Sequence, residues 1–158
     1  MAVGWSLLTI TPTDEAVQQL TDSWAWLLPE PFKPLLFSAL GDVFFQSNSG
    51  NVFWLNTGTA EVTQVADSPT HFRELLGTEV ITQWFLPPLI ERLRNAGKLL
   101  GPGQCYTYVT LPVFAEGKYE VGNLNPVPAH EHFSLTGKIL SQIQSLSHGA
   151  EVRLSVGP

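Results

Sequence analysis

Three short segments rich in strand-forming residues follow one another between residues 39 and 66, and they constrain the fold more than any other feature. Residues 39–46 (ALGDVFFQ) and 52–55 (VFWL) flank a turn sequence at 47–50. Residues 59–66 (TAEVTQVA) follow a second turn sequence and alternate less polar with polar side chains, as a half-buried strand does. The pattern predicts an antiparallel meander.

Helix-type segments lie on both sides of this block. Thr11 as N-cap and Pro12 in the first helical position predict a helix to about Leu28, which the prolines at 29, 31 and 34 end. Residues 31–36 leave open a second helix close behind it. Outside these helices, residues 3–10 favour a short strand or extended arm.

Beyond the meander, helices are expected near 67–77 and 78–96, the second broken or restarted at Pro87-Pro88, with Gly97 as C-terminal cap. Strand-like segments at 104–113 and 118–125 precede a last helix at about 129–146, and 147–158 reads as a tail or short strand. Helices and strands are thus segregated along the chain. We expect an α+β fold, with an antiparallel or mixed sheet packed against several helices in one domain, residues 1–158.

The composition of the chain excludes several classes of function and of site. Charged residues make up 14% of the 158 residues and the formal net charge is −6, which argues against binding a nucleic-acid backbone. Cys105 is the single cysteine, so an internal disulfide framework and a multi-cysteine zinc site are excluded. No apolar run reaches the roughly 20 residues that span a bilayer, and the first ten residues show no secretory signal. We expect a cytoplasmic protein that does not bind membranes.

The net charge is unevenly distributed along the chain. Residues 1–72 carry seven acidic residues and one basic residue, whereas residues 73–158 carry seven of each. Like charge gathered on one part of a surface speeds encounter with a basic partner, although acidic surfaces also serve solubility alone.

Motifs that carry chemistry are sparse. His130 and His132 stand two apart on a predicted helix, so they point to different sides and do not chelate one ion; His132 is expected in the core and His130 at the surface. The Gly101-Pro102-Gly103 sequence lacks the third glycine of a dinucleotide fingerprint. Cys105 has no adjacent cation to lower its pKa and is expected to be a buried free thiol. We therefore expect no catalytic residue, no metal and no cofactor.

An interaction surface is the better prediction. Trp24 falls on the inward face of the first long helix, whereas Trp26 follows Asp22 by four positions and falls on its polar face. An aromatic anchor among acids is typical of an interface hot spot; the alternative is that Trp26 packs beneath residues 29–34. The candidate partner-binding residues are Glu15, Asp22, Trp26, Glu30, Asp42, Glu61 and Asp67.

Several segments, taken in order, resemble a known family. They are SWAWLLP at 23–29, LFSALGDVFF at 36–45, VFWLNT at 52–57, VADS at 65–68, WFLP at 84–87, GPGQCY at 101–106, GKYEVGNL at 117–124 and HFS at 132–134. Together they resemble the type VI secretion immunity family represented by the C-terminal domain of DNase-immunity proteins, which often follows a GAD-like module. The resemblance spans roughly residues 20–146, and too few residues precede Leu20 for such a module.

The resemblance implies a cytoplasmic antidote that binds a cognate toxin, commonly a nuclease, without catalysis. An acidic protein is suited to occupy the basic surface with which a nuclease holds phosphate. The matched motifs are turns and aromatic core positions, so they carry no binding residues over. A non-catalytic small-molecule sensor remains the alternative, since aromatic residues (11%) also line pockets. An enzyme ranks last.

Overall fold

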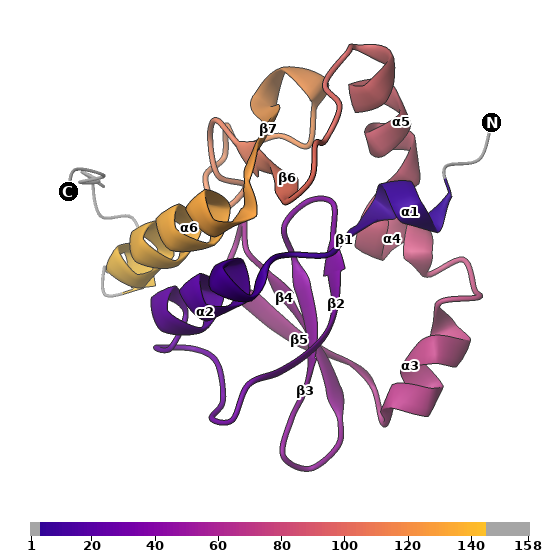
Figure 1. Cartoon of the computed structure of the whole chain (residues 1–158), viewed down its shortest axis with the longest axis vertical. Coiled ribbons are helices and arrows are strands. Elements are labelled where there is room, and N and C mark those ends of the chain that lie inside the picture. Colours follow the sequence, from indigo (N-terminus) through magenta and orange to yellow (C-terminus); the bar gives the residue numbers. More distant parts are fainter. Residues whose placement is uncertain (1–3, 145–158) are drawn as a thin grey trace.

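The computed structural model describes residues 4–144, which form two antiparallel sheets and six α-helices (Figure 1). In chain order, the elements are α1 (Trp5–Leu8), β1 (Thr9–Ile10), α2 (Asp14–Ser23), β2 (Lys33–Ser38), β3 (Val43–Gln46), β4 (Val52–Asn56), β5 (Glu61–Ala66), α3 (Pro69–Leu75), α4 (Ile81–Phe85), α5 (Pro87–Asn95), β6 (Gln104–Tyr108), the 3₁₀ turn η1 (Val121–Asn123), β7 (Leu124–Pro128) and α6 (Ala129–Gln144). This confirms the α+β class.

The larger sheet is an antiparallel meander in the order β1-β2-β3-β4-β5, as the pattern at 39–66 predicts. The smaller sheet pairs β6 with β7. A backbone hydrogen bond of 2.8 Å from the Tyr106 amide to the Ala39 carbonyl joins β6 to the turn before β3. The two sheets therefore share one core.

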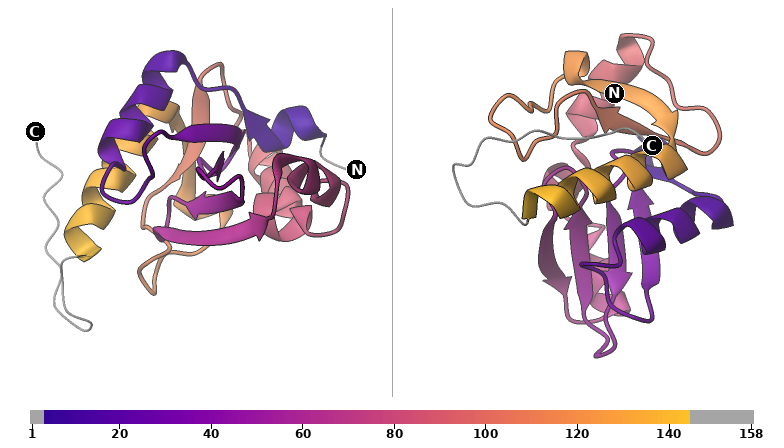
Figure 2. Two further views of the ribbon diagram at one scale, coloured as in Figure 1. Left: turned by 90° about the horizontal axis from the view of Figure 1, so that it is seen from below. Right: turned by 90° about the vertical axis from the view of Figure 1, so that its left-hand side faces the viewer.

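Helices cover both faces of the larger sheet (Figure 2). On one side α2 and α6 lie together, and Phe37 of β2 meets Phe133 of α6 with ring centroids 5.9 Å apart. On the other side Phe44 of β3 contacts Phe72 of α3 and Trp84 of α4, at 5.0 and 5.4 Å. Val43, Phe44 and Phe45 of β3 are all buried, so this strand contacts apolar side chains on both faces of the sheet.

The N-terminal segment departs from the expectation. Residues 5–8 form a short helix followed by a two-residue strand, and the N-cap of α2 is Thr13, whose hydroxyl accepts the Ala16 amide at 3.1 Å. Thr13 is favoured over Thr11 as N-cap because a helix that starts after Thr13 has Asp14 and Glu15 in its first turn, where their charge complements the helix dipole. The helix also ends at Ser23, and turns replace its predicted last residues up to Leu28.

Two strands contradict the sequence expectation. Residues 33–38 form β2 where a second helix was left open, and β7 starts at Leu124, whereas the strand was predicted from residue 118. By contrast, β3, β4 and β5 fall inside or within one residue of their predicted segments. The predicted short strand at 151–156 lies outside the described residues.

Candidate functional site

The tight connection between β2 and β3 carries a buried carboxyl group. The Ser38 amide donates to the Asp42 carbonyl at 2.9 Å, and the Asp42 amide donates to the Ser38 hydroxyl at 3.2 Å. Gly41 supplies the left-handed backbone that this turn needs, with φ of 80°. The Asp42 side chain is thereby directed into the protein, where the residue is 2% exposed.

The Asp42 carboxylate is held by neutral donors. Its Oδ1 accepts the Thr57 amide at 2.9 Å and the Thr57 hydroxyl at 3.1 Å, and its Oδ2 accepts the Trp54 indole N–H at 3.2 Å. Within residues 4–144 no basic side chain forms an ion pair with it. Burial is the largest influence and raises the pKa of Asp42 to about 6, while the bonds to Thr57 and Trp54 act in the opposite direction.

His132 continues this polar network into α6. Its Nε2 lies 2.8 Å from the Thr57 hydroxyl and its Nδ1 lies 2.8 Å from the Thr107 hydroxyl of β6. Burial lowers the pKa of His132 to about 4, so the ring is neutral at pH 7. The sequence prediction of a core histidine is confirmed, and His130 is exposed as predicted.

A pocket of about 230 Å³ lies beside Asp42, and we name it the Asp42 pocket. Its aromatic walls come from Trp54 of β4, Trp84 of α4 and Tyr119 of the segment between β6 and η1. Its polar lining consists of Asp42 and the amide side chains of Asn56 and Gln83.

The Asp42 pocket contains a strained backbone position. Leu86, which lines it, has φ of 49° and ψ of 57° between α4 and α5, a left-handed conformation that is unusual for leucine and for a residue before proline. Such strain costs on the order of 1–3 kcal/mol and persists only where the surrounding structure over-determines it. This strained residue separates α4 from α5 at the edge of the pocket.

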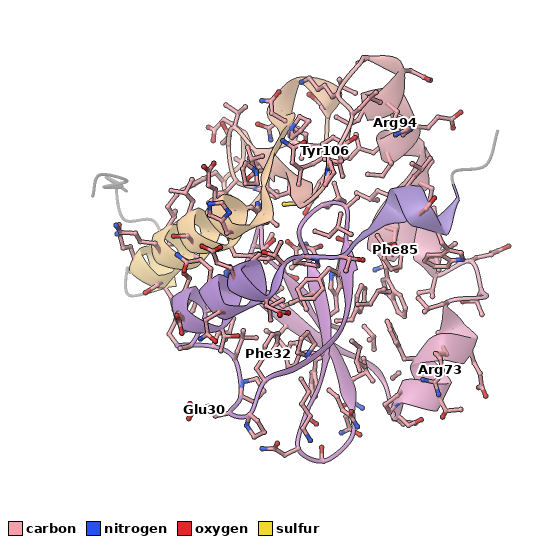
Figure 3. All side chains as sticks on the ribbon, viewed as in Figure 1. Glu30, Phe32, Arg73, Phe85, Arg94 and Tyr106 are labelled. Carbon is pink, nitrogen blue, oxygen red and sulfur yellow. The ribbon has the colours of Figure 1, made fainter. Side chains whose placement is uncertain are left out.

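The predicted partner-binding residues separate into two groups. Glu15 and Asp22 are exposed seven positions apart on α2, and so share one side of the helix. Asp22 lines two adjoining hollows of about 490 and 240 Å³, the first with Trp26 and Lys138 and the second with Glu30. We name Glu15, Asp22, Trp26 and Glu30 the α2 face; Figure 3 labels Glu30 at its lower end.

Trp26 differs from the prediction that placed it on the polar face of the helix. Because α2 ends at Ser23, Trp26 lies in the following turn, where its indole N–H donates to the Ser23 carbonyl at 3.1 Å. It stacks on the buried Trp24 with centroids 5.4 Å apart and is itself half-buried. Trp24 is fully buried, as predicted.

The other predicted acids lie away from the α2 face. Glu61 begins the edge strand β5, is exposed, and faces Asn56 of β4 in the register of the sheet, which puts it next to the Asp42 pocket. Asp67 is exposed just after β5, with Oδ2 3.9 Å from Nδ1 of His71. Asp42 corrects the expectation of a surface acid, because the apolar run that follows it carries it into the core.

The sequence did not predict the Asp42 pocket. Trp54 was expected in the core and is half-buried, while Tyr119 was assigned to a strand and is exposed in a loop. Asn56 Nδ2 donates to the Tyr119 hydroxyl at 3.3 Å across 63 positions of sequence. No local signal predicts a contact of that span; only an aspartate directly before the apolar residues 43–45 could have pointed to it.

The single cysteine and the possible metal ligands were the remaining candidates for chemistry. Cys105 is buried, and burial raises its thiol pKa well above the usual range, so the thiol is protonated at neutral pH. Within residues 4–144, no three His, Cys, Asp or Glu side chains gather as a metal site would require. None of the helices in that range is long and apolar enough to cross a membrane.

Residues 67–140 match a family model described as T6SS immunity protein Tdi1, C-terminal. The matched family is a type VI secretion immunity family. The match confirms the resemblance stated from the sequence, and it supports the role of an immunity protein, a class that is generally non-enzymatic. No curated protein matches the chain.

The Tdi1-type segment, residues 67–140, runs from the end of β5 into α6. It contributes His132 to the buried network, and Trp84 and Tyr119 to the Asp42 pocket. Thr107 of the network and Gln83 and Leu86 of the pocket also fall within it, whereas Asp42, its partners Trp54 and Thr57, and the whole α2 face precede it. The Asp42 pocket is therefore built partly from the matched segment, whereas the four residues of the α2 face all lie outside it.

Proposed function

We propose that this chain is a cytoplasmic immunity protein that binds a cognate type VI secretion toxin and neutralises it without catalysis. The match to the Tdi1-type family carries the proposal, because an immunity protein requires a toxin as its partner. We further propose that the toxin is a nuclease. A nuclease presents a basic surface for phosphate, and the acids of residues 1–72 suit such a surface.

We place the primary contact on the α2 face. Its acids are exposed, and Asp22 and Glu30 line two adjoining hollows, the first of them next to Trp26. A hollow beside an aromatic side chain favours the insertion of a partner side chain. The half-buried Trp26 is fixed by its bond to Ser23 and its stacking on Trp24, so little side-chain entropy is lost when a partner covers it. This arrangement suits an interface anchor.

The test is binding of the toxin encoded next to this chain. We expect the double variant Asp22→Lys, Trp26→Ala to weaken binding at least 30-fold by calorimetry, since removing one hot spot alone costs about 2 kcal/mol. Association should slow mainly at low salt, because screening removes the electrostatic contribution. The matched control is Glu116→Lys, a charge reversal at an exposed acid away from the α2 face. Unchanged affinity would discard the α2 face and leave the family role standing.

A small-molecule sensor is the second candidate because of one observation. A hollow of about 440 Å³ between the N-terminal segment and the α5–β6 connection contains Arg94 and Tyr106, both labelled in Figure 3. Its volume lies within the range of ligand sites. A thermal-shift screen that finds strong stabilisation by an anionic metabolite, lost in Arg94→Met, would favour this function; the immunity role predicts stabilisation by the toxin.

A further inference from the structure

We propose that the Asp42 pocket binds a guanidinium group, presented as an arginine side chain by a protein partner. The proposal rests on the proposed function only in that the partner is a protein. It does not require the partner to cover the α2 face.

The charge of the pocket calls for a cation. An ionised carboxylate that is buried among neutral groups loses hydration, and a cation that enters its surroundings recovers much of that loss. Asp42 is 2% exposed and its described partners, Thr57 and Trp54, are neutral donors. None of the residues that line the pocket is basic. The counter-ion position is therefore open to a group from outside.

The walls of the pocket favour a planar cation. The indole rings of Trp54 and Trp84 and the phenol ring of Tyr119 line it, and aromatic faces attract cations that are weakly hydrated. Guanidinium combines a delocalised charge with a flat shape that stacks on such faces, whereas an ammonium group is compact and strongly hydrated. The lining thus favours arginine over lysine.

The hydrogen-bonding groups agree with this choice. A guanidinium carries five N–H donors and no acceptor. Oδ2 of Asp42 has one described donor, Trp54, and retains a second lone pair, and Gln83 adds an amide group to the lining. The side-chain oxygen of Asn56, by contrast, already accepts the Gly58 amide at 2.8 Å. The free lone pair of the carboxylate thus offers an acceptor to a group that carries only donors.

The size of the pocket indicates a side chain in place of a whole metabolite. Small-molecule sites usually enclose about 300–1,000 Å³, and the Asp42 pocket encloses about 230 Å³. Glu61 is exposed next to the pocket, since it pairs with Asn56 in the sheet, so an approaching basic segment meets a negative charge at the surface first. Gln83 of α4 is exposed and contributes to the lining. These features fit one arginine of a larger partner.

The test uses the isolated chain and a small arginine compound. The indole N–H of Trp54 donates to Asp42, so its ¹H–¹⁵N resonance reports directly on the carboxylate. We expect Nα-acetyl-arginine amide to shift this resonance saturably. The matched ligand control is Nα-acetyl-citrulline amide, which has the same shape without the charge and should bind at least tenfold more weakly.

Variants separate the pocket from the general surface charge. Asp42→Asn should weaken binding of the arginine compound at least tenfold, whereas Asp67→Asn, the same change at an exposed site, should leave it unaltered. Because Asp42→Asn also alters the core, exposed Gln83 provides a second pair: Gln83→Lys should weaken binding and Gln83→Glu should strengthen it. Equal shifts with both compounds, or arginine binding unchanged in a folded Asp42→Asn protein, would overturn the proposal. Toxin binding is not measured here, so the two proposals fail separately.

Discussion

The Thr57 hydroxyl oxygen lies 2.8 Å from Nε2 of His132, which ties the turn after β4 to the beginning of α6. The same hydroxyl lies 3.1 Å from Oδ1 of Asp42. One side chain thus connects two buried titratable groups whose pKa values move in opposite directions. The Thr57 hydroxyl has a single proton, and both Oδ1 of Asp42 and the Gly41 carbonyl oxygen, 3.0 Å away, can only accept it. A consistent assignment therefore places a proton on Nε2 of His132, which the Thr57 oxygen accepts.

These opposite pKa shifts predict how stability depends on pH. Asp42 has a folded pKa of about 6, above its ordinary 3.8, so its contribution is fully present below pH 3.8 and is lost as the pH rises through 6. His132 has a folded pKa of about 4, below its ordinary 6.5, so its contribution is present above pH 6.5 and is lost as the pH falls through 4. Each effect is on the order of 2–3 kcal/mol, and in the native protein they offset each other.

Variants should separate the two contributions. We expect Asp42→Asn to lose stability between pH 6.5 and 4, because His132 then acts alone, and His132→Gln to gain stability over pH 6 to 4. Urea unfolding of the native protein and both variants at pH 7, 6, 5 and 4 measures the difference, with the native curve as the common background. Parallel curves for all three proteins would show that neither pKa is shifted.

The close approach of Gly41 to His132 predicts that a larger residue at position 41 destabilises the protein. A Cβ at Gly41 would collide with the Nε2 and Cδ2 atoms of the His132 ring, and the backbone there is left-handed, with φ of 80°. We expect Gly41→Ala to cost about 3 kcal/mol, the sum of backbone strain and the displaced ring. Gly97→Ala is the control, because its φ of 83° is equivalent but no atom lies within 4 Å of the added methyl group. The control should cost about 1 kcal/mol, and equal losses would assign the whole effect to the backbone.

The sequence predicts the centre of the fold well and its proline-containing strands poorly. Segments 39–46 and 52–55 are rich in strand-forming residues, segment 59–66 alternates, and turn residues separate the three; each contains or closely overlaps a strand. β2 contains Pro34, but β1 pairs only with Phe37 and Ser38, so the proline lies on a stretch with one open edge. β7 likewise contains Pro126 and pairs with β6. Proline is tolerated where no donor is needed, and local pattern does not reveal which edge is open.

Charge patterns predict candidate acids but not their depth in the protein. The same reasoning selected Asp22 and Asp42, yet the first is exposed on α2 and the second is buried before β3. Depth depends on contacts between segments far apart in sequence, such as the 75 positions between Thr57 and His132. The family resemblance came from motifs spread along the chain, which is why it was visible in the sequence when the pocket was not.

Lys98 provides a third prediction because it joins distant backbone segments. Its Nζ donates to the Val121 carbonyl at 2.7 Å and to the Leu124 carbonyl at 2.8 Å, which holds η1 and β7 against the end of α5. Lys98→Met keeps the aliphatic stem and leaves both carbonyls without this donor. We expect a loss of about 1–3 kcal/mol in the free energy of unfolding, measured in urea. The exposed Lys118→Met should change it by less than about 0.5 kcal/mol; similar losses in both would contradict a specific role for Lys98.

The close contact of Gly137 in α6 with Ser23 at the end of α2 gives a fourth prediction, which concerns the support of the α2 face. A Cβ at this position of α6 would lie 2.9 Å from the Ser23 carbonyl carbon at the end of α2, closer than real Cβ contacts allow, so the two helices would have to separate. We expect Gly137→Ala to cost about 1–3 kcal/mol of stability even though alanine is the better helix former by about 1 kcal/mol. Gly122→Ala, where the methyl group meets no atom within 4 Å, is the control and should be nearly neutral.

The same substitution should also be visible in the fluorescence of the folded protein. The Ser23 carbonyl accepts the Trp26 indole N–H, so displacing Ser23 should alter the emission of Trp26. A Gly137→Ala protein as stable as the native one, with unchanged emission, would show that α2 and α6 are not held in contact at this point.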